Sequence, residues 1–320
     1  MNHLQHLRKD VQKSQVDIVG HSQDVHGNQM VSAVLTYPLF VHAEVMTHRM
    51  FARNAASGRA IPGKIYRDTT ASNPVIPYAL QKKHPGMQGS EYLPEELQKS
   101  AERYIRQHLE DTIELAQYLD GAFGVTKQYT NRLLSPFSWM RLLVTTSKEG
   151  LENFFNLRCH KDAEIHIMEL AHKFRDKLAW STPKLLSPGE WHIPFQEQAE
   201  ELLHDKFSSM PDSETLEGDK LQLLVEVATG IAARTSYTLI GDMKGWETYK
   251  NIHDKMLVMD PFHASPFEHC TQCLGTEEYY TYGKMLGKDD KGEQIIDYGW
   301  VDNFKGFKSY RNILEKQWEK

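Results

Sequence analysis

The stretch from residue 38 to residue 59, PLFVHAEVMTHRMFARNAASGR, constrains this chain more than any other. It follows residues 30–37, MVSAVLTY, whose β-branched and apolar side chains predict a strand. Pro38 suits the first turn of a helix, because its missing N–H would have no helical partner there. The sequence therefore predicts a strand and then a short helix that ends at His48, leaving the polar side chains after it free.

Hydrogen-bond donors are unusually dense after this predicted helix. The donor side chains are His48, Arg49, Arg53, Asn54, Ser57 and Arg59, with a glycine beside the serine. Such a set suits a multiply charged anion such as a phosphate. The alternative is a charged loop end that binds nothing, since a short motif is only a hypothesis until its structural context is known. The stretch is therefore interpreted as an anion or nucleotide site.

Composition places the chain in an ordinary class. With 320 residues, 40% hydrophobic and 25% charged, it has the profile of a soluble globular protein with a large core. A net charge of -6 argues against nucleic-acid binding through the overall field. The sequence lacks the run of about 18 apolar residues typical of a membrane helix. Its first residues, MNHLQHLRKDVQK, have no apolar signal core, so we expect a cytoplasmic protein.

The rest of the chain divides into recognisable segments. Residues 1–28 are polar, and we expect them to be partly mobile. Residues 60–94 are rich in proline and glycine, which indicates a lid, a binding loop or a disordered insertion. We expect a lid. The apolar spacing over residues 97–116 predicts a long amphipathic helix that stops at Gly121.

Further helices are predicted in the second half. Asp162 is the expected N-cap of a helix whose apolar stripe is Ile167, Leu170, Ala171, Phe174 and Leu178. Asp219 and Gln222 have capping-box spacing ahead of another apolar run. The segment from Asp297 onward is aromatic and basic, and we expect it to end in a short docking helix.

The 38–59 stretch also resembles a family signature. The ThyX-type flavin-dependent thymidylate synthases carry R-H-R-x-x-S-x-N-x-x-S-x-R, and here the same frame is T-H-R-M-F-A-R-N-A-A-S-G-R. The matching positions are His48, Arg49, Asn54, Ser57 and Arg59. Thr47 and Ala52 depart from the signature, and Ala55 stands where the family usually has a glutamate. These departures leave the arrangement of the flavin pocket and the exact product open.

Three other blocks resemble the same family. NFFNLR (153–158) with AEIHI (163–167) is similar to N-F-L-x-L-R…A-Q-x-E-I, AARTSY (232–237) to A-R-V-S-Y, and HASPFEH (263–269) to H-x-S-P-F-E-H. In the family the last two precede the H-R motif, whereas here they follow it. That order indicates a circular permutation, in which we expect HASPFEH to form a strand beside residues 30–37 and the 47–59 motif despite the distance in sequence. The resemblance implies one catalytic domain over residues 1–320, with an α/β (α+β) fold whose central mixed sheet is flanked by helices.

The resemblance implies a reaction and its cofactors. The family makes dTMP from dUMP with methylenetetrahydrofolate as carbon donor, FAD as hydride carrier and NADPH as reductant, and the cofactor carries the difficult chemistry. It also implies a homotetramer whose sites are shared between subunits. One alternative is a relative that hydroxymethylates dUMP or dCMP. Another is a nucleotide-binding relative without turnover, which Thr47 and Ala55 favour.

The resemblance assigns roles to particular residues. Arg158 and Ser57 are the expected catalytic residues, with Arg158 on the pyrimidine carbonyl edge, where a planar guanidinium stabilises charge at N3. Ser57, Gly58 and Arg59 would hold the nucleotide, and Arg132 would reach its phosphate from another subunit. The residues that fall where the family binds flavin and folate are His48, Arg49, Asn54, Asn153, His263, Ser265 and Glu268.

Two glutamates replace glutamines of the family, at Glu44 and Glu164. Glu44 takes a position near the nucleotide, and an ionised carboxylate only accepts hydrogen bonds. Because the amino group of cytosine needs an acceptor, Glu44 at that edge would favour a cytosine nucleotide. The alternative is an ion pair of Glu44 with Arg49 or Arg53.

Cysteines and histidines do not predict a metal site. One C-x-x-C pair, Cys270 and Cys273, without a second pair is a weak zinc signal, and we expect buried thiols. His160 and His166 lie six residues apart and so on different faces of a helix. The other thymidylate synthase class uses a cysteine that directly follows a proline. In this sequence no cysteine follows a proline. The resemblance implies a chemistry that needs no protein nucleophile, and the sequence agrees with it.

Overall fold

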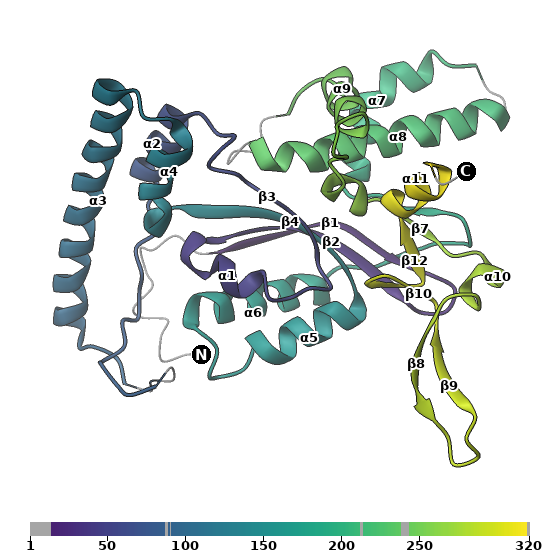
Figure 1. Ribbon diagram of the computed structural model, residues 1–320, viewed down its shortest axis with the longest axis horizontal. Coiled ribbons are helices and arrows are strands. Elements are labelled where there is room, and N and C mark those ends of the chain that lie inside the picture. The colour runs from purple at the N-terminus through teal and green to yellow at the C-terminus, as the bar shows by residue number, and fades with distance from the viewer. Residues whose placement is uncertain (1–13, 87–88, 90, 212–213, 238–242, 319–320) are drawn as a thin grey trace.

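A mixed sheet of five strands lies at the centre of the computed structural model, which describes residues 14–86, 89, 91–211, 214–237 and 243–318 (Figure 1). The strand order is β3-β4-β2-β1-β5, and only the β1–β5 pair is parallel. The strands are β1 Gln15–Gln23, β2 Gln29–Pro38, β3 Ala52–Ala55, β4 Trp139–Ser147 and β5 Lys184–Leu185. The predicted α/β (α+β) fold with a central mixed sheet is confirmed.

Helices cover both faces of this sheet, and a group of three lies beyond its end (Figure 1). α5 and α6 pack on one face, α8 and α9 on the other, and α2, α3 and α4 pack on one another. The helices are α1 His42–Val45, α2 Gly63–Ser72, α3 Glu95–Phe123, α4 Lys127–Leu133, α5 Lys148–Arg158, α6 Ile165–Ala179, α7 Gln196–Ser208, α8 Glu214–Arg234, α9 Trp246–Leu257, α10 Thr276–Tyr279 and α11 Tyr310–Trp318.

Short strands and 3-10 helices complete the fold. β12 pairs with β7 and β7 with β6, and the β8–β9 hairpin projects away from the body (Figure 1). The strands are β6 Trp191–His192, β7 Thr271–Cys273, β8 Gly283–Lys288, β9 Gln294–Tyr298, β10 Trp300–Val301, β11 Phe304–Lys305 and β12 Phe307–Ser309. The 3-10 helices are η2 Leu39–Val41, η3 Ser135–Phe137, η4 Thr235–Tyr237 and η5 Ser265–Glu268. The short C-terminal helix predicted from the sequence is confirmed as α11.

β2 is buried on both faces, which explains its nearly continuous apolar sequence. Val31 and Leu35 pack in the core beneath α5 and α6, while Val34 packs in the core beneath α8 and α9. Alternate side chains of a strand point to opposite faces, so a central strand covered on both sides needs apolar residues throughout. The predicted strand at residues 30–37 is therefore correct.

A hydrogen-bonded row of buried polar side chains crosses the α8 face of the sheet. Ser22 bonds to His192 Nδ1 at 2.9 Å, and His192 Nε2 bonds to Ser32 at 2.8 Å. Ser32 bonds to Thr145 at 2.6 Å, and Thr145 bonds to His269 Nδ1 at 2.9 Å. All five side chains are buried. The row fastens the HASPFEH segment to β2 and β4.

AARTSY and HASPFEH, which follow the H-R motif here and precede it in the family, lie close to that motif in the folded chain. η5, within HASPFEH, packs against β3, and η4, within AARTSY, packs against β3 and β4. The expected proximity of HASPFEH to the 47–59 motif is confirmed. Its expected form as a strand is wrong, because Pro266 stands in the first turn of the 3-10 helix and has no N–H for a ladder.

Four helix limits differ from the sequence predictions. The helix expected to end at His48 consists of η2, Leu39–Val41, and α1, which ends at Val45. α3 ends at Phe123 rather than at Gly121, because the helix continues until Gly124 adopts the left-handed conformation at φ +64°. α6 is capped by Glu164, whose carboxylate accepts from the backbone N–H of His166 and Ile167, so Asp162 is not the cap. Asp219 lies inside α8, which begins at 214.

The segments expected to be mobile contain ordered elements. Residues 15–23 form β1, which corrects the prediction for that part of 1–28, while residues 1–13 lie outside the described residues. The 60–94 segment includes α2, and Val75 is buried and donates its N–H to the Phe137 carbonyl at 2.7 Å. A lid role for this segment stays a prediction.

Candidate functional site

Arg158, the last residue of α5, joins two of the sequence motifs in one cluster. Its Nε donates to His48 Nε2 at 3.0 Å, and its Nη1 donates to Glu44 Oε2 at 3.2 Å. Its Nη2 donates to the Glu44 carbonyl at 3.2 Å and to Thr47 Oγ1 at 3.1 Å. Glu44 is thus an ion-pair partner of Arg158, not of Arg49 or Arg53.

Local structure explains why these groups meet. α1 ends at Val45, and the chain then turns so that His48 N–H donates to the Val45 carbonyl at 3.2 Å. The His48 ring packs edge-on against Phe154 of α5, with centroids 4.8 Å apart. Phe154 is fully buried, so α5 is fixed against the sheet and carries Arg158 at its C-terminal end. The cluster is therefore held by the core on both sides.

The electrostatics of the cluster favour a neutral histidine. Burial, reinforced by Arg158 and Arg53, lowers the pKa of His48 to about 4. Because Nε2 accepts a hydrogen bond from Arg158, the imidazole proton belongs on Nδ1. Nδ1 is buried and has no hydrogen-bond partner within the described part of the chain. The neutral ring therefore keeps one buried donor for which the described residues supply no acceptor.

The pKa of Glu44 shifts in the opposite direction from that of His48. Burial raises the pKa of its carboxyl, with Arg158 opposing the rise and Glu164 adding to it. Glu164 itself caps α6 and pairs with His166 at 2.6 Å. Arg158 therefore holds the Glu44 carboxyl, while the Glu164 carboxyl is held by the first residues of α6.

The predicted nucleotide-holding residues follow β3. The Ser57 side chain accepts from the Arg59 N–H at 3.3 Å, and Asn131 of α4 donates to the Gly58 carbonyl at 2.8 Å. Arg59 and Arg132 are both exposed. Asn131 was not predicted from the sequence, where its position next to Arg132 is the signal that could have identified it. The turn is thus fixed by α4 of the same chain, with two arginines at the surface nearby.

Other predicted site residues lie around this arrangement. Asn54 is buried and donates to the carbonyl of Ala232, while its own oxygen accepts from Ser236 at 2.8 Å. It therefore ties β3 to the AARTSY block. Asn153 is exposed on α5, and His263 is exposed before η5. Roles of Asn54, Asn153, His263 and Ser265 in flavin binding stay predictions.

A cavity of about 720 Å³ adjoins the H-R motif. It brings together Arg49 and Glu268, two of the residues predicted to bind flavin. Its other walls come from the motif and from the C-terminal segment: Phe51, Ala52, Arg53, Asp302, Asn303, Phe304, Ser309, Arg311, Asn312 and Glu315. The C-terminal residues of this cavity were not predicted from the sequence, where the basic and aromatic composition after Asp297 is the available signal.

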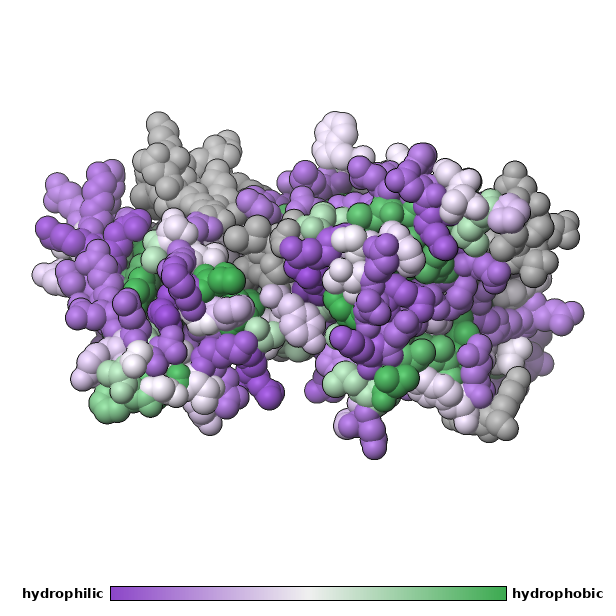
Figure 2. All heavy atoms as spheres, turned by 90° about the horizontal axis from the view of Figure 1, so that it is seen from above, coloured by the Kyte–Doolittle hydropathy of each residue, from purple (hydrophilic) through white to green (hydrophobic). Residues whose placement is uncertain are grey.

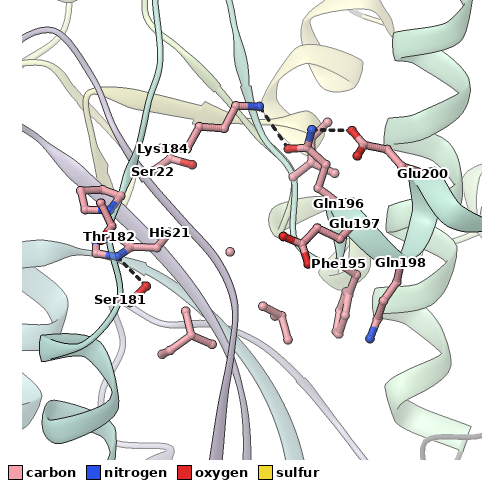
Figure 3. Close-up of a pocket in the computed structure, with 15 residues that line it drawn as sticks. His21, Ser22, Ser181, Thr182, Lys184, Phe195, Gln196, Glu197, Gln198 and Glu200 are labelled. Atoms are coloured by element: carbon pink, nitrogen blue, oxygen red, sulfur yellow. Dashed lines mark hydrogen bonds between the residues drawn. The ribbon is translucent and has the colours of Figure 1, made fainter.

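A separate cavity of about 570 Å³ lies between β1 and the beginning of α7 (Figure 3). Figure 3 shows His21 and Ser181 on one side, hydrogen-bonded at 3.0 Å, and Gln196 and Glu197 on the other. Lys184 donates to Gln196 at 3.3 Å. None of the four sequence motifs contributes to the walls of this cavity, so we do not assign the predicted chemistry to it.

The sequence model of the thymidylate synthase complementing protein (Thy1) family matches residues 13–184, more than half of the chain. The chain belongs to this family. The matched range contains the Arg158 cluster and the turn after β3, while AARTSY and HASPFEH lie beyond it. As a member of the family, the protein is a nucleotide-modifying enzyme of the ThyX type.

Two solved structures resemble about half of this chain. The chain resembles a UMP/dUMP methylase PolB from Streptomyces cacaoi bound with 5-Br UMP, at 17% identity and a TM-score of 0.45, over 54% of this chain and 92% of that one. The same methylase bound with 5-Br dUMP gives 15% identity and a TM-score of 0.44, over 53% and 91%. No curated protein matches. The family assignment rests on the family match.

Among the described residues, no helix is long and apolar enough to cross a membrane, and no group of three or more His, Cys, Asp and Glu side chains is arranged to hold a metal ion. Cys270 and Cys273 are buried, as predicted. Burial raises the pKa of each thiol to about 12, so both stay protonated. A protonated thiol is a poor metal ligand.

Proposed function

We propose that this protein is a flavin-dependent thymidylate synthase that reductively methylates dUMP to dTMP with methylenetetrahydrofolate, FAD and NADPH. The observation that carries the proposal is the Arg158 cluster. It joins the end of N-F-F-N-L-R to the H-R motif through hydrogen bonds to His48, Glu44 and Thr47. Two motifs that are far apart in the sequence thus build one polar site within the matched family region.

Arg158 is the residue best placed to act on the pyrimidine. Its guanidinium is planar and permanently charged, and its orientation is fixed by three neighbouring residues. Facing the carbonyl edge of a pyrimidine, it would stabilise negative charge at N3 and so make C5 more nucleophilic. Such preorganised donors give the largest electrostatic contribution to catalysis. Ser57, Gly58 and Arg59 would hold the phosphate.

The residues present fit a flavin, which when bound supplies the hydride-transfer chemistry. The unpartnered Nδ1–H of His48 offers one buried donor. The adjoining cavity, about 720 Å³, lies within the usual 300–1,000 Å³ of ligand sites. Phe51 gives it an apolar wall, and Arg49 and Arg53 give it positive charge. His48, Arg49 and Glu268 are the residues that we expect to contact the cofactor.

Flavin binding is the first test. We expect the purified protein to be yellow, or FAD to raise its unfolding temperature, because a ligand that binds only the native state must stabilise it. NADPH should bleach the flavin absorbance in the presence of nucleotide, which separates an enzyme from a nucleotide-binding relative. Product analysis would then distinguish dTMP from a hydroxymethylated nucleotide. Absence of bound flavin together with an unfolding temperature that FAD leaves unchanged would refute the proposal.

The homotetramer with shared sites belongs to the same proposal. α3 and α4 expose large apolar side chains, including Tyr104 at 73% and Phe123 at 67% exposure. Figure 2 shows apolar residues reaching the surface at the left of the molecule, where α2, α3 and α4 lie. Exposed apolar area of this kind marks interaction surfaces. Arg132 lies on α4 beside it, which supports a contact that carries Arg132 to the nucleotide of another subunit.

A second candidate, action on a cytosine nucleotide, is favoured by Glu44. One of its carboxylate oxygens binds Arg158, so the side chain lies where Arg158 would meet the pyrimidine. Glu44 only accepts hydrogen bonds when ionised, which suits the amino group of cytosine, whereas the carbonyl of uracil needs a donor. The ion pair alone, without contact to the base, is the simpler role and leaves dUMP as substrate.

Binding of dUMP and dCMP to the wild type and to Glu44→Gln separates these roles. If Glu44 faces the base, the substitution should shift the affinity ratio toward dUMP by about tenfold or more, since an unpaired buried polar group costs roughly 1–3 kcal/mol. The matched control is Glu164→Gln, because Glu164 is a neighbouring carboxylate that caps α6 instead of binding Arg158. A dUMP preference that neither substitution moves would leave Glu44 as an ion-pair partner only.

A further inference from the structure

We infer that residues 302–315, which lie outside the matched family region, form half of the flavin pocket, and that Arg311 binds the flavin ring. The inference rests on the proposed function. The cavity beside the H-R motif is lined by Arg49, Phe51 and Arg53 of the motif and by residues of this C-terminal segment, including Arg311. A ligand that fills the cavity therefore meets both.

The C-terminal segment is a firm wall because the core fixes it at several points. β12 pairs antiparallel with β7 of the sheet that follows HASPFEH. Phe304 and Phe307 are buried in one apolar cluster with Ala52 of β3. Asn303 donates its side-chain N–H to the Arg49 carbonyl at 3.2 Å. The segment thus reaches the H-R motif directly, although about 250 residues of chain separate them.

Arg311 is oriented by two carboxylates. Its Nη1 donates to Glu268 Oε1 at 2.8 Å, and its Nε donates to Glu315 Oε1 at 2.8 Å. The neighbouring Tyr310 is buried and begins α11, which fixes the backbone. Nη2 makes no hydrogen bond within the described residues, so the planar group still has donors to offer. Glu268 belongs to HASPFEH, and Arg311 therefore extends that motif into the cavity.

The charged side chains that line the cavity indicate which part of the flavin binds there. Three arginines, at 49, 53 and 311, line the cavity together with three carboxylates, at 268, 302 and 315. A cavity with balanced charge and side-chain amides suits a planar heterocycle with alternating N–H and C=O groups better than it suits a bare polyphosphate. Within the described residues, Arg49 has no ion-pair partner and is exposed, so it is the cation left for a phosphate at the rim.

Two ring systems share this chemistry, the isoalloxazine of flavin and the pterin of folate, and binding experiments separate them. The variant is Arg311→Ala, and the probes are FAD, riboflavin, ADP and 5-formyltetrahydrofolate. Loss of charged hydrogen bonds should weaken FAD and riboflavin by about 10-fold to 100-fold and leave ADP unchanged. Flavin fluorescence quenching gives the first two affinities without any turnover, and calorimetry gives the others.

Lys308→Ala is the matched control. Lys308 lies in β12 of the same segment and also pairs with a glutamate, Glu278, at 2.7 Å, but it does not line the cavity. Arg311→Lys gives a second variant that keeps the charge and loses the planar donors. Comparison of unfolding temperatures without ligand shows whether each variant is folded.

The outcomes are distinct. Flavin affinity that falls in Arg311→Ala and not in Lys308→Ala supports the inference. If Arg311→Ala binds flavin as tightly as the wild type, the inference is overturned while the proposed function stands. Weaker binding of 5-formyltetrahydrofolate with unchanged riboflavin assigns the pocket to the pterin and also overturns it. Wild-type protein that binds no flavin at all removes the proposed function and this inference together.

Discussion

Replacement of Arg158 by lysine is expected to lower kcat by about 10²–10³-fold, the usual cost of losing one preorganised electrostatic donor. In the native protein the guanidinium makes hydrogen bonds in three directions, to His48, Glu44 and Thr47. A lysine ammonium keeps the charge but cannot hold that planar arrangement while also facing a pyrimidine. Steady-state kinetics with dUMP, together with the dissociation constant for dUMP, measure the effect.

The matched control is Thr47→Val, which removes one hydrogen-bond partner of Arg158 and leaves the charge in place. Its kcat should stay within about tenfold of the wild type, because a single neutral hydrogen bond contributes roughly 0.5–1.5 kcal/mol. If Arg158→Lys keeps a near wild-type kcat, the stabilisation of the pyrimidine anion belongs to another residue. If only nucleotide affinity falls, Arg158 binds the substrate without favouring the transition state.

The central strand and the motif that follows it could be predicted from the sequence. Residues 30–37 are apolar on both faces, and such a pattern fits a strand covered by helices on each side. Pro38 ends that strand, but the helix expected to reach His48 is instead a 3-10 turn followed by a four-residue helix that ends at Val45. The local pattern was therefore sufficient to find the strand and the start of the turn, and not the extent of the helix.

The partners within the site could not be predicted in the same way. Glu44 pairs with Arg158, 114 residues away, and not with the nearby Arg49 or Arg53. Its partner depends on where α5 ends against the sheet, and the tertiary packing decides that position. The cap of α6 shows the same limit, because Glu164 accepts from two N–H groups while the better-ranked Asp162 lies before the helix. Pattern scores rank residues without knowing which one the core places at the helix end.

The C-terminal wall of the cavity was missed for a related reason. No motif marks Arg311 or Asn303, and each acquires a role only when β12 pairs with β7 and brings the segment beside β3. The resemblance of HASPFEH to the family predicted that Glu268 lies near the cofactor, yet it gave no indication of what faces Glu268. Residues outside a motif become visible as site residues only after the chain has folded.

The buried row of polar side chains leads to the prediction with the largest effect on stability. Complete burial lowers the pKa of both His192 and His269 to about 3, so both stay neutral in the native protein. In the unfolded chain a histidine takes up a proton below its ordinary pKa of about 6.5. The unfolded state therefore binds more protons as the pH falls, and the free energy of unfolding decreases. The stability is present above pH 6.5 and is lost progressively toward pH 3.

Between pH 7 and pH 4 we expect these two histidines to lower the free energy of unfolding by about 3 kcal/mol each, or ~6 kcal/mol together. Urea unfolding at pH 7, 6, 5 and 4 measures the slope. His269→Asn keeps a hydrogen-bonding group near Thr145 but cannot titrate, so it should remove about half of the loss. His204→Asn, on the exposed side of α7, is the control and should keep the wild-type slope. A slope that is the same in all three proteins would show that the buried row does not set the acid sensitivity.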